Sequence, residues 1–169
     1  RTTKFGKDGD PLTCEKLNSL RSRLENLQLL IIDEVSMVGS DMLLNIHKRL
    51  CELKGTSEYL FGNVSILAVG DLYQLPPVLQ PHIYDSVRNP LANLNGSLWK
   101  ENFELLELDE VMRQKDDKAF AELLCRVRLG KQTKNDIELL QSRNTDITHQ
   151  DYPHNALHVF AYNADVDDW

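Results

Sequence analysis

Short apolar runs are spaced along the chain and are separated by longer mixed segments. They are LQLLIID at 27–33, VSILAV at 64–69, FELLEL at 103–108 and ALHVFAYN at 156–163. Runs this short and continuous are typical of β-strands, and the first two are apolar enough to be covered on both faces, as strands of a parallel sheet are. The pattern therefore predicts four strands.

Between these runs, apolar residues recur every three or four positions, which is the spacing of one face of an α-helix. This pattern predicts helices over 13–25 and about 41–54, a third that closes at Gly130 and a fourth capped by Thr133. Gly55 is expected to end the second helix. Strands that alternate with helices indicate an α/β fold with a mainly parallel sheet. Ligands bind such sheets at the carboxyl ends of the strands, so polar residues there are the first candidates for chemistry.

Composition narrows the class of protein. The 169 residues are 41% hydrophobic and 27% charged, which is typical of a globular chain. The net charge of -7 lacks the overall basic character that is common in nucleic-acid-binding proteins. Three widely spaced cysteines fit no disulfide framework, and no apolar run is long enough to cross a bilayer. We therefore expect a soluble intracellular protein with no membrane partner, and we interpret the chain as a piece of a longer one.

Two acids follow the first predicted strand directly. Asp33 comes after LLII, and Glu34 is the next residue. A rigid strand end is a suitable place for a carboxylate that holds a phosphate-bound Mg²⁺, usually through water. A second carboxylate one residue later would orient or deprotonate an attacking water. A strand that simply ends in two solvated acids explains the same letters, so the pair alone leaves both interpretations open.

The second strand ends in Gly70 and Asp71, and Gln74 follows in a loop stiffened by Pro76 and Pro77. A neutral amide both donates and accepts hydrogen bonds, which suits a group that senses a terminal phosphate or its attacking water. A stiff loop would then carry that signal to a distant site. A proline-rich turn with an incidental glutamine is the alternative.

Three further candidate residues rest on weaker signals. Arg113 follows the third predicted strand, where an arginine would neutralise charge on a transferring phosphoryl group. Tyr73 and His82 lie in or next to the proline-rich loop, and aromatic rings there would stack on the bases of a single strand.

Taken together, these motifs resemble a known family. LLIIDEVSMV at 29–38 resembles a Walker B motif, and GDLYQLPPV at 70–78 resembles the third motif of RecD-like superfamily-one DNA helicases, closest to the petite integration frequency (PIF-type) helicases. The segment 108–143 is similar to the one that joins their two RecA-like domains, and 158–169 is similar to the start of the second domain.

The resemblance implies a motor that uses ATP and Mg²⁺ to move 5′ to 3′ on single-stranded DNA and to open duplexes, forks and G-quadruplexes. Asp33 would hold magnesium, Glu34 would be the catalytic base, and Gln74 and Arg113 would contact the γ-phosphate. The nucleotide-binding set implied by the family is Asp33, Glu34, Gly70, Asp71, Gln74 and Arg113. The residues implied to couple nucleotide state to DNA are Tyr73, Leu75, Pro76, Pro77 and His82.

The resemblance also implies a domain organisation. Residues 1–108 would be the C-terminal part of a first RecA-like ATPase domain, 109–155 an inter-domain helical segment, and 156–169 the start of a second RecA-like domain. The phosphate-binding pattern G-x-x-x-x-G-K-[ST] does not occur in the 169 residues. We therefore expect the segment alone to lack ATPase activity. The parent is expected to be a monomeric motor in DNA replication, repair, recombination or telomere maintenance, located in the nucleus or mitochondrion if eukaryotic.

Two other functions remain open from the sequence. One is a catalytically inactive RecA-like interaction module that binds a partner without turning over ATP. The other is a different nucleotide-dependent enzyme, such as an RNA helicase or an exonuclease subunit. Four separate polar groups placed where one nucleotide needs them favour the DNA helicase over the inactive module.

Overall fold

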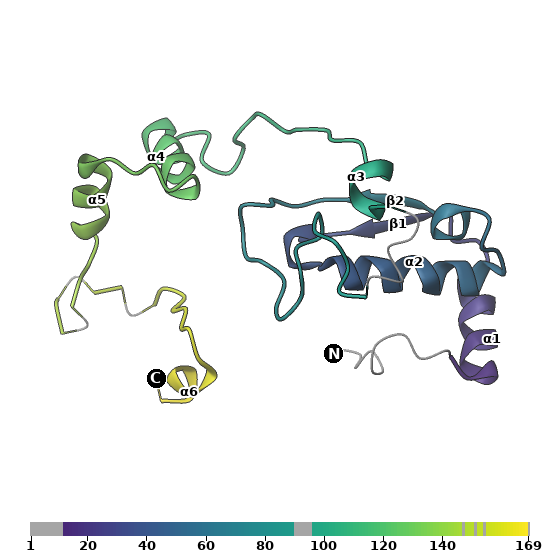
Figure 1. Ribbon diagram of the computed structural model, residues 1–169. Helices are drawn as coiled ribbons and strands as arrows, with labels where there is room; N and C mark the ends of the chain where they lie inside the picture. Colours follow the sequence, from purple (N-terminus) through teal and green to yellow (C-terminus); the bar gives the residue numbers. More distant parts are fainter. Residues whose placement is uncertain (1–11, 90–95, 147, 151, 154, 169) are drawn as a thin grey trace. The chain divides into compact units, whose positions relative to one another are not determined.

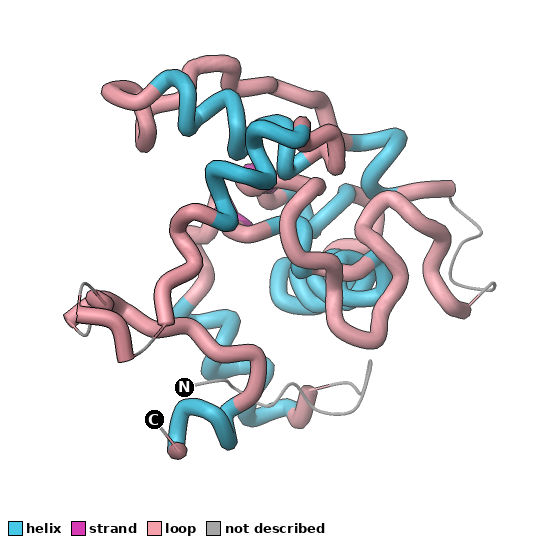
Figure 2. Tube along the Cα trace, turned by 90° about the vertical axis from the view of Figure 1, so that its left-hand side faces the viewer, coloured by secondary structure: helices cyan, strands magenta, loops and turns pink. Residues whose placement is uncertain are grey.

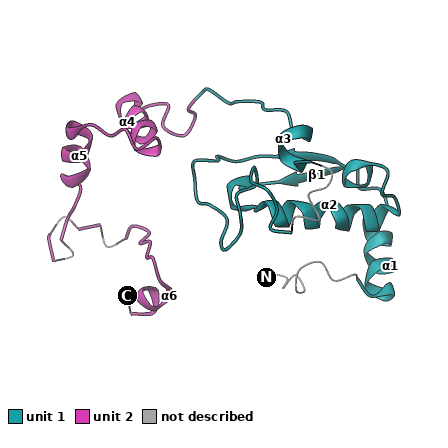
Figure 3. Cartoon of the chain, viewed as in Figure 1, with its two compact units in different colours: residues 1–110 teal, residues 111–169 magenta. Residues whose placement is uncertain are grey.

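The computed structural model describes residues 12–89, 96–146, 148–150, 152–153 and 155–168 (Figure 1). The chain divides into two compact units, Arg1–Glu110 and Val111–Trp169 (Figure 3), which are taken in turn. Among the described residues, no helix has both the length and the apolar character needed to cross a bilayer.

A two-stranded parallel sheet organises the first unit. Strands β1 (Leu29–Ile32) and β2 (Ser65–Ala68) pair in register from Leu29 with Ser65 to Ile32 with Ala68. The chain between them contains helix α2 (Ser40–Lys54), which supplies the long crossover that parallel strands require (Figure 1). The α/β fold class with a parallel sheet is thus confirmed, as are the first two predicted strands.

The core of this unit lies around α2. Its fully buried apolar side chains come from the turn after β1, from α2, from the 3-10 turn η2 (Leu60–Asn63) and from a distant loop: Val35, Val38, Leu43, Leu50, Phe61, Val64 and Ile83. Helix α2 ends where the sequence predicts, because Gly55 adopts a left-handed φ of 67° that a glycine reaches without a Cβ penalty.

Helix α1 (Cys14–Arg23) buries none of its residues and is fastened to α2 by cations. The Arg21 guanidinium donates a hydrogen bond of 2.8 Å to the Glu52 carbonyl, and the Lys54 ammonium donates to the carbonyls of Leu24 (3.3 Å) and Glu25 (2.9 Å). These carbonyls lie at helix ends, where helices leave acceptors unsatisfied. Thr13 occupies the N-cap position of α1, although its side chain makes no capping hydrogen bond.

A short helix closes the described part of the first unit. Helix α3 (Leu98–Asn102) begins at Ser97, whose side chain accepts a hydrogen bond from the Lys100 backbone. Its Trp99 ring stacks on Phe103 with centroids 4.6 Å apart. Phe103 in turn meets Phe61 edge to face, which joins this helix to the core.

The second unit consists of helices α4 (Lys118–Arg128), α5 (Lys134–Gln141) and α6 (Asn163–Asp167). The predicted cap of α5 is confirmed: Thr133 and Asp136 form a capping box, in which each side chain accepts a hydrogen bond from the other's backbone N–H. Asp136 also accepts two hydrogen bonds of 2.7 Å from the Arg126 guanidinium, which ties α5 to α4.

The third and fourth predicted strands are wrong. Residues 103–108 have no regular secondary structure, and within 156–163 the chain runs from a turn through an irregular segment into α6. A strand needs a neighbour that completes its hydrogen-bond ladder, and β1 and β2 are the only strands within the described residues. Leu105, Leu106 and Leu108 are accordingly 84–93% exposed. Figure 2 shows how small the strand content is (magenta) beside the loops (pink).

Candidate active site at the strand ends

Backbone hydrogen bonds continue past the last paired residues of β1 and β2. The Val69 N–H donates to the Ile32 carbonyl at 2.8 Å, and the Val35 N–H donates to the Val69 carbonyl at 3.0 Å. These two bonds bracket Asp33 and Glu34 on one strand and bring them beside the start of the second loop. The sequence prediction that polar residues follow the carboxyl ends of neighbouring strands is confirmed for these two segments.

The two acids after β1 are held in an unusual backbone conformation. Glu34 has φ 52° and ψ 48°, the left-handed region that residues with a Cβ rarely adopt, and its N–H donates to Asp33 Oδ1 at 2.8 Å. Both side chains are exposed. Strained backbone of this kind concentrates at functional sites, where surrounding structure over-determines it. Here the over-determination comes from the turn η1 (Val35–Met37), which buries Val35 and Ser36 directly afterwards.

Gly70 permits the close approach of the two strand ends. Its φ is 150°, and a Cβ on residue 70 would lie 2.8 Å from the Val35 nitrogen and 3.4 Å from the Glu34 carbonyl carbon. Real Cβ atoms do not approach a backbone nitrogen this closely, so any other residue would push the two segments apart. Gly70 therefore has a structural role at the site, whether or not it also contacts a nucleotide.

The loop after β2 starts with a tight turn built on Asp71. Its carboxylate accepts a hydrogen bond from the Tyr73 N–H at 3.0 Å, and its carbonyl accepts one from the Gln74 N–H at 2.9 Å. The Gln74 side chain is exposed, as are Leu75 and Pro76. Pro77, in contrast, is buried. The turn therefore presents the Gln74 amide outward close to the strand end, while Pro77 anchors the loop behind it.

The two aromatic candidates differ in their exposure. Tyr73 is 65% exposed. His82 is half-buried, and its ring already stacks on Tyr84 with centroids 5.1 Å apart and an interplanar angle of 3°. Its backbone also bridges to Gly39 at the start of α2. The DNA-coupling role stays a prediction for both.

Arg113 belongs to the other compact unit. It lies exposed in a turn that precedes α4. Its contact with a γ-phosphate bound at the strand ends stays a prediction, as do the domain boundaries at 108 and 155.

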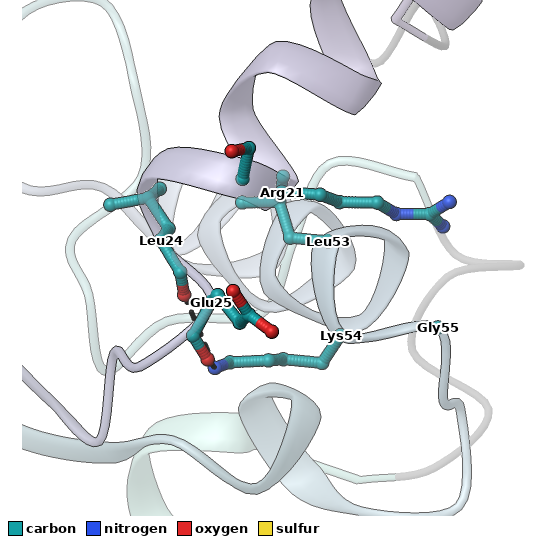
Figure 4. A pocket seen from close by; sticks show the side chains of 7 residues that line it. Arg21, Leu24, Glu25, Leu53, Lys54 and Gly55 are labelled. Atoms are coloured by element: carbon teal, nitrogen blue, oxygen red, sulfur yellow. Dashed lines mark hydrogen bonds between the residues drawn. The ribbon is translucent and has the colours of Figure 1, made fainter.

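A pocket lies away from these strand ends. It lies between the C-terminal ends of α1 and α2, has a volume of about 590 Å³, and is lined by Arg21, Ser22, Leu24, Glu25, Leu53, Lys54 and Gly55 (Figure 4). The dashed lines in Figure 4 mark the two Lys54 hydrogen bonds that cross it. Helix C-termini present carbonyl oxygens and partial negative charge, and the Arg21 and Lys54 cations of this pocket are bonded to such carbonyls.

The strand-end groups fit a magnesium ion and a nucleotide in their chemistry. Asp33 and Glu34 offer exposed carboxylate oxygens, the donor type that Mg²⁺ prefers, and one or two carboxylates together with waters and substrate phosphates normally complete its shell. Over the described residues, His, Cys, Asp and Glu side chains form no group of three or more that would hold a metal by protein ligands alone. Water-mediated binding of Mg²⁺ by Asp33 stays a prediction.

Comparison with known sequences decides the family. The family model for PIF1-like helicase matches residues 7–138. The chain belongs to the PIF1-like helicase family. Its relatives include the ATP-dependent DNA helicase PIF1 of Emericella nidulans, 28% identical over 167 residues, and that of Xenopus laevis, 35% identical over 132 residues. These matches cover 96% and 76% of the chain but only 22% and 20% of the relatives, so the chain spans about a fifth of each relative's length.

Solved PIF1-family structures share the fold. A Bacteroides Pif1 bound to single-stranded DNA superposes with a TM-score of 0.67 and 26% identity. A second Bacteroides complex, with ADP-AlF3 and single-stranded DNA, superposes with a TM-score of 0.69 and 28% identity. Each covers 98% of the chain, and the chain covers 38% of each. The predicted membership of the PIF-type helicases and the RecA-like fold of this PIF1-like segment are thereby confirmed.

One long-range contact outside the strand-end site was missed by reasoning from sequence. Arg88 and Asp41, 47 positions apart, join the far end of the 71–88 loop to the N-terminus of α2. A lone arginine in a loop and an acid in the first turn of a helix have no spacing that links them, so no sequence pattern pointed to this pair.

Proposed function

We propose that the chain is the catalytic part of an ATP-dependent DNA helicase that couples hydrolysis of Mg-ATP to 5′-to-3′ movement on single-stranded DNA. The observation that carries the proposal is the bonding of the two strand ends through Val35 and Val69. This bonding places the acids at 33–34 beside the loop that contains Gln74. Family membership and the Pif1 complexes with single-stranded DNA and ADP-AlF3 support it.

Each residue has a separate task in this proposal. Asp33 orients the waters around the magnesium ion, which when bound neutralises charge on the phosphates. Glu34 accepts a proton from the attacking water, and the exposure of its carboxylate supports this role. Gln74 donates to and accepts from groups at the γ-phosphate. Arg113 approaches the same phosphate when the two RecA-like domains close.

The isolated 169-residue segment is proposed to be inactive, because it has no G-x-x-x-x-G-K-[ST] sequence to cradle the phosphates. Hydrolysis is therefore assigned to the longer parent protein. The neighbouring turn of Asp71 and the exposed residues after it would pass the nucleotide state on to DNA.

The substrates and setting follow from the same proposal. Forked DNA is supported by a Pif1 structure described as unwinding forked duplex DNA by two coordinating helicases, which covers 98% of this chain at a TM-score of 0.66. G-quadruplex DNA and action as a monomeric motor are further proposals. We also propose action in replication, repair, recombination or telomere maintenance, in the nucleus or mitochondrion if the parent is eukaryotic.

The deciding experiment measures ATP hydrolysis by the full-length parent with and without single-stranded DNA, beside its Glu34→Gln variant. Glutamine keeps the size of the side chain but cannot accept the proton, so we expect hydrolysis to fall by about 10² to 10⁴-fold. Glu25→Gln is the matched control, because Glu25 is an exposed acid next to the α1–α2 pocket and away from the strand ends.

The two outcomes separate the functions that the sequence leaves open. Hydrolysis that DNA stimulates and that Glu34→Gln abolishes supports a DNA-dependent motor. A folded full-length protein that hydrolyses no ATP under either condition would refute the motor and leave the inactive RecA-like interaction module. Stimulation by RNA but not by DNA would point to an RNA helicase instead.

A further inference from the structure

The loop that follows β2 is fastened at its far end to the helix that follows the acids. The Arg88 N–H donates to Asp41 Oδ1 at 3.0 Å, and its Nε lies 3.6 Å from Asp41 Oδ2. The same guanidinium donates to the Leu79 carbonyl. One arginine therefore joins three points: the loop at 79, the loop at 88 and the first turn of α2. The backbone N–H makes the contact with Asp41 Oδ1, and the planar guanidinium reaches Asp41 Oδ2 and the Leu79 carbonyl with two different nitrogens.

Backbone contacts reinforce this attachment. The Ser40 N–H donates to the Pro81 carbonyl at 3.2 Å, and Gly39 pairs with His82 in an antiparallel bridge. A Cβ on residue 39 would collide with the Gln80 side chain, so the helix start and the loop are packed without a gap. Ile83 is 2% exposed and lies in the core beside α2. Residues 79–88 are thus attached firmly to the N-terminal end of α2.

Most of the loop between the two attachments is exposed, with the exception of the buried Pro77. Its near end is held by the Val35–Val69 hydrogen bond and its far end by Arg88. Between them, Leu75, Val78 and Leu79 are 70%, 75% and 86% exposed. With both ends held to the same β1–α2 segment, a displacement at Gln74 cannot be absorbed by drift of the whole loop. Such a displacement would instead move the exposed side chains of Leu75, Val78 and Leu79.

We propose that Asp41 and Arg88 are positioning residues that make the 71–79 loop transmit the nucleotide state to DNA. This inference rests on the helicase function proposed above and names the part that couples its two activities. The Asp41 and Arg88 side chains are 26% and 62% exposed, and ion pairs this accessible to solvent contribute little to overall stability. Loss of the pair should therefore loosen the hold of Arg88 on Leu79, while the Ser40–Pro81 and Gly39–His82 backbone contacts remain and keep the protein folded.

The test uses the full-length protein and compares wild type with Arg88→Ala and Asp41→Asn. We measure ATP hydrolysis without DNA, hydrolysis at saturating single-stranded DNA, the DNA concentration for half-maximal stimulation, and the thermal midpoint. We expect near wild-type hydrolysis without DNA and an unchanged midpoint, but a loss of DNA stimulation of about tenfold. Arg88→Lys keeps the charge but offers a single ammonium, so it should restore stimulation only in part.

Matched controls and outcomes keep the inference separate from the proposed function. Arg23→Ala removes an exposed arginine of α1 and should behave as wild type. If wild type is stimulated by DNA and both variants are stimulated equally, the positioning role is wrong. If hydrolysis falls by the same factor with and without DNA, the pair is merely structural and the inference is also wrong. If wild type itself is not stimulated, the proposed helicase function fails first. If the thermal midpoint of Arg88→Ala is lowered, the DNA stimulation of Asp41→Asn decides the question. Asparagine keeps a side-chain oxygen that accepts the hydrogen bond from the Arg88 backbone N–H.

Discussion

Gly70 lies against Val35 so closely that a Cβ on residue 70 would be 2.8 Å from the Val35 nitrogen. The same Val35 nitrogen donates the hydrogen bond to Val69 that joins the two strand ends. The two strand ends can therefore join through this hydrogen bond only because residue 70 has no side chain. Everything that the site is proposed to do depends on it.

Gly70→Ala should separate the two strand ends. We expect a loss of about 1–3 kcal/mol of unfolding free energy, because the substitution adds a clash to an unfavourable backbone conformation. Urea denaturation of the full-length protein measures it. Gly55→Ala is the matched control, because Gly55 also has positive φ but no described atom lies within 4 Å of its Cβ position. Equal losses in the two variants would show that the contact with Val35 is unimportant.

Asp136→Asn should loosen α5 from α4. Asp136 is 5% exposed and accepts from Arg126 and from the Thr133 backbone, and the amide would replace one acceptor oxygen with a donor facing those donors. We expect a lower thermal midpoint at neutral pH. Glu122→Gln is the control, since Glu122 approaches the same guanidinium at 3.8 Å but is exposed. An equal effect of both substitutions would argue against the special role of Asp136.

The same carboxylate predicts a pH dependence. Hydrogen bonds from the Arg126 guanidinium hold the pKa of Asp136 well below its ordinary value, and the hydrogen bond from the Thr133 backbone N–H is the second largest cause. A lowered folded-state pKa stabilises the fold at pH values above the unfolded pKa of about 3.9, and this stabilisation is lost as pH falls toward the folded value. The difference in thermal midpoint between wild type and Asp136→Asn should therefore shrink steadily below pH 4. A difference that stays constant down to pH 2 would contradict the assignment.

His47 should make the first unit sensitive to mild acid. Its Nδ1 accepts the Phe61 N–H at 3.0 Å, which requires an unprotonated nitrogen. Burial, and then the nearby Lys48 charge, lowers the pKa of His47. Stability should be complete above the unfolded pKa of about 6.5 and should decline as pH falls through the folded value.

The matching experiment follows thermal midpoints between pH 7.5 and pH 5 in wild type and His47→Gln. The variant should lose the part of the pH dependence that His47 supplies. The control His149→Gln alters an exposed histidine in the second unit and should retain it. A wild-type thermal midpoint that does not change between pH 7.5 and pH 5 would show that His47 does not make the fold sensitive to acid.

Gln74→Ala should impair catalysis and spare the fold. Its side chain is exposed, while its backbone N–H, which any residue keeps, makes the turn with Asp71. We expect ATP hydrolysis by the full-length protein to fall by about 10²-fold, as happens when one polar stabiliser of a transition state is removed. Gln141→Ala, an exposed glutamine of α5, is the control. Unchanged hydrolysis in Gln74→Ala would exclude it from the phosphate site.

The elements that could be predicted from sequence are those with local signals. Helix α2 ends at Gly55 and α5 begins at Thr133 because a glycine in the left-handed region and a hydroxyl cap act on their own neighbours. The two confirmed strands are apolar runs separated by a helix of sufficient length. The run at 103–108 has a similar apolar pattern and still does not form a strand. Pairing depends on a distant partner, which the sequence of the run does not contain.

The site divides in the same way. The positions of Asp33 and Glu34 after one strand, and of Asp71 after the next, follow from strand order and the common edge of a parallel pair. Packing determines the left-handed backbone of Glu34 and the close contact that requires glycine at position 70. No periodic pattern in the sequence predicts either feature. The contact between Asp41 and Arg88 is equally non-local.

The parallel pairing also has a consequence for biosynthesis. It joins residues 36 positions apart, as Leu29 and Ser65 are, whereas the contacts of α2 with η2 span much shorter stretches of chain. Contacts between distant residues form later because more chain entropy is lost on closing the loop. We therefore expect the helical part to fold on the ribosome first. The ribosome therefore has to translate past Gly70 before the sheet edge proposed to bind ATP can form.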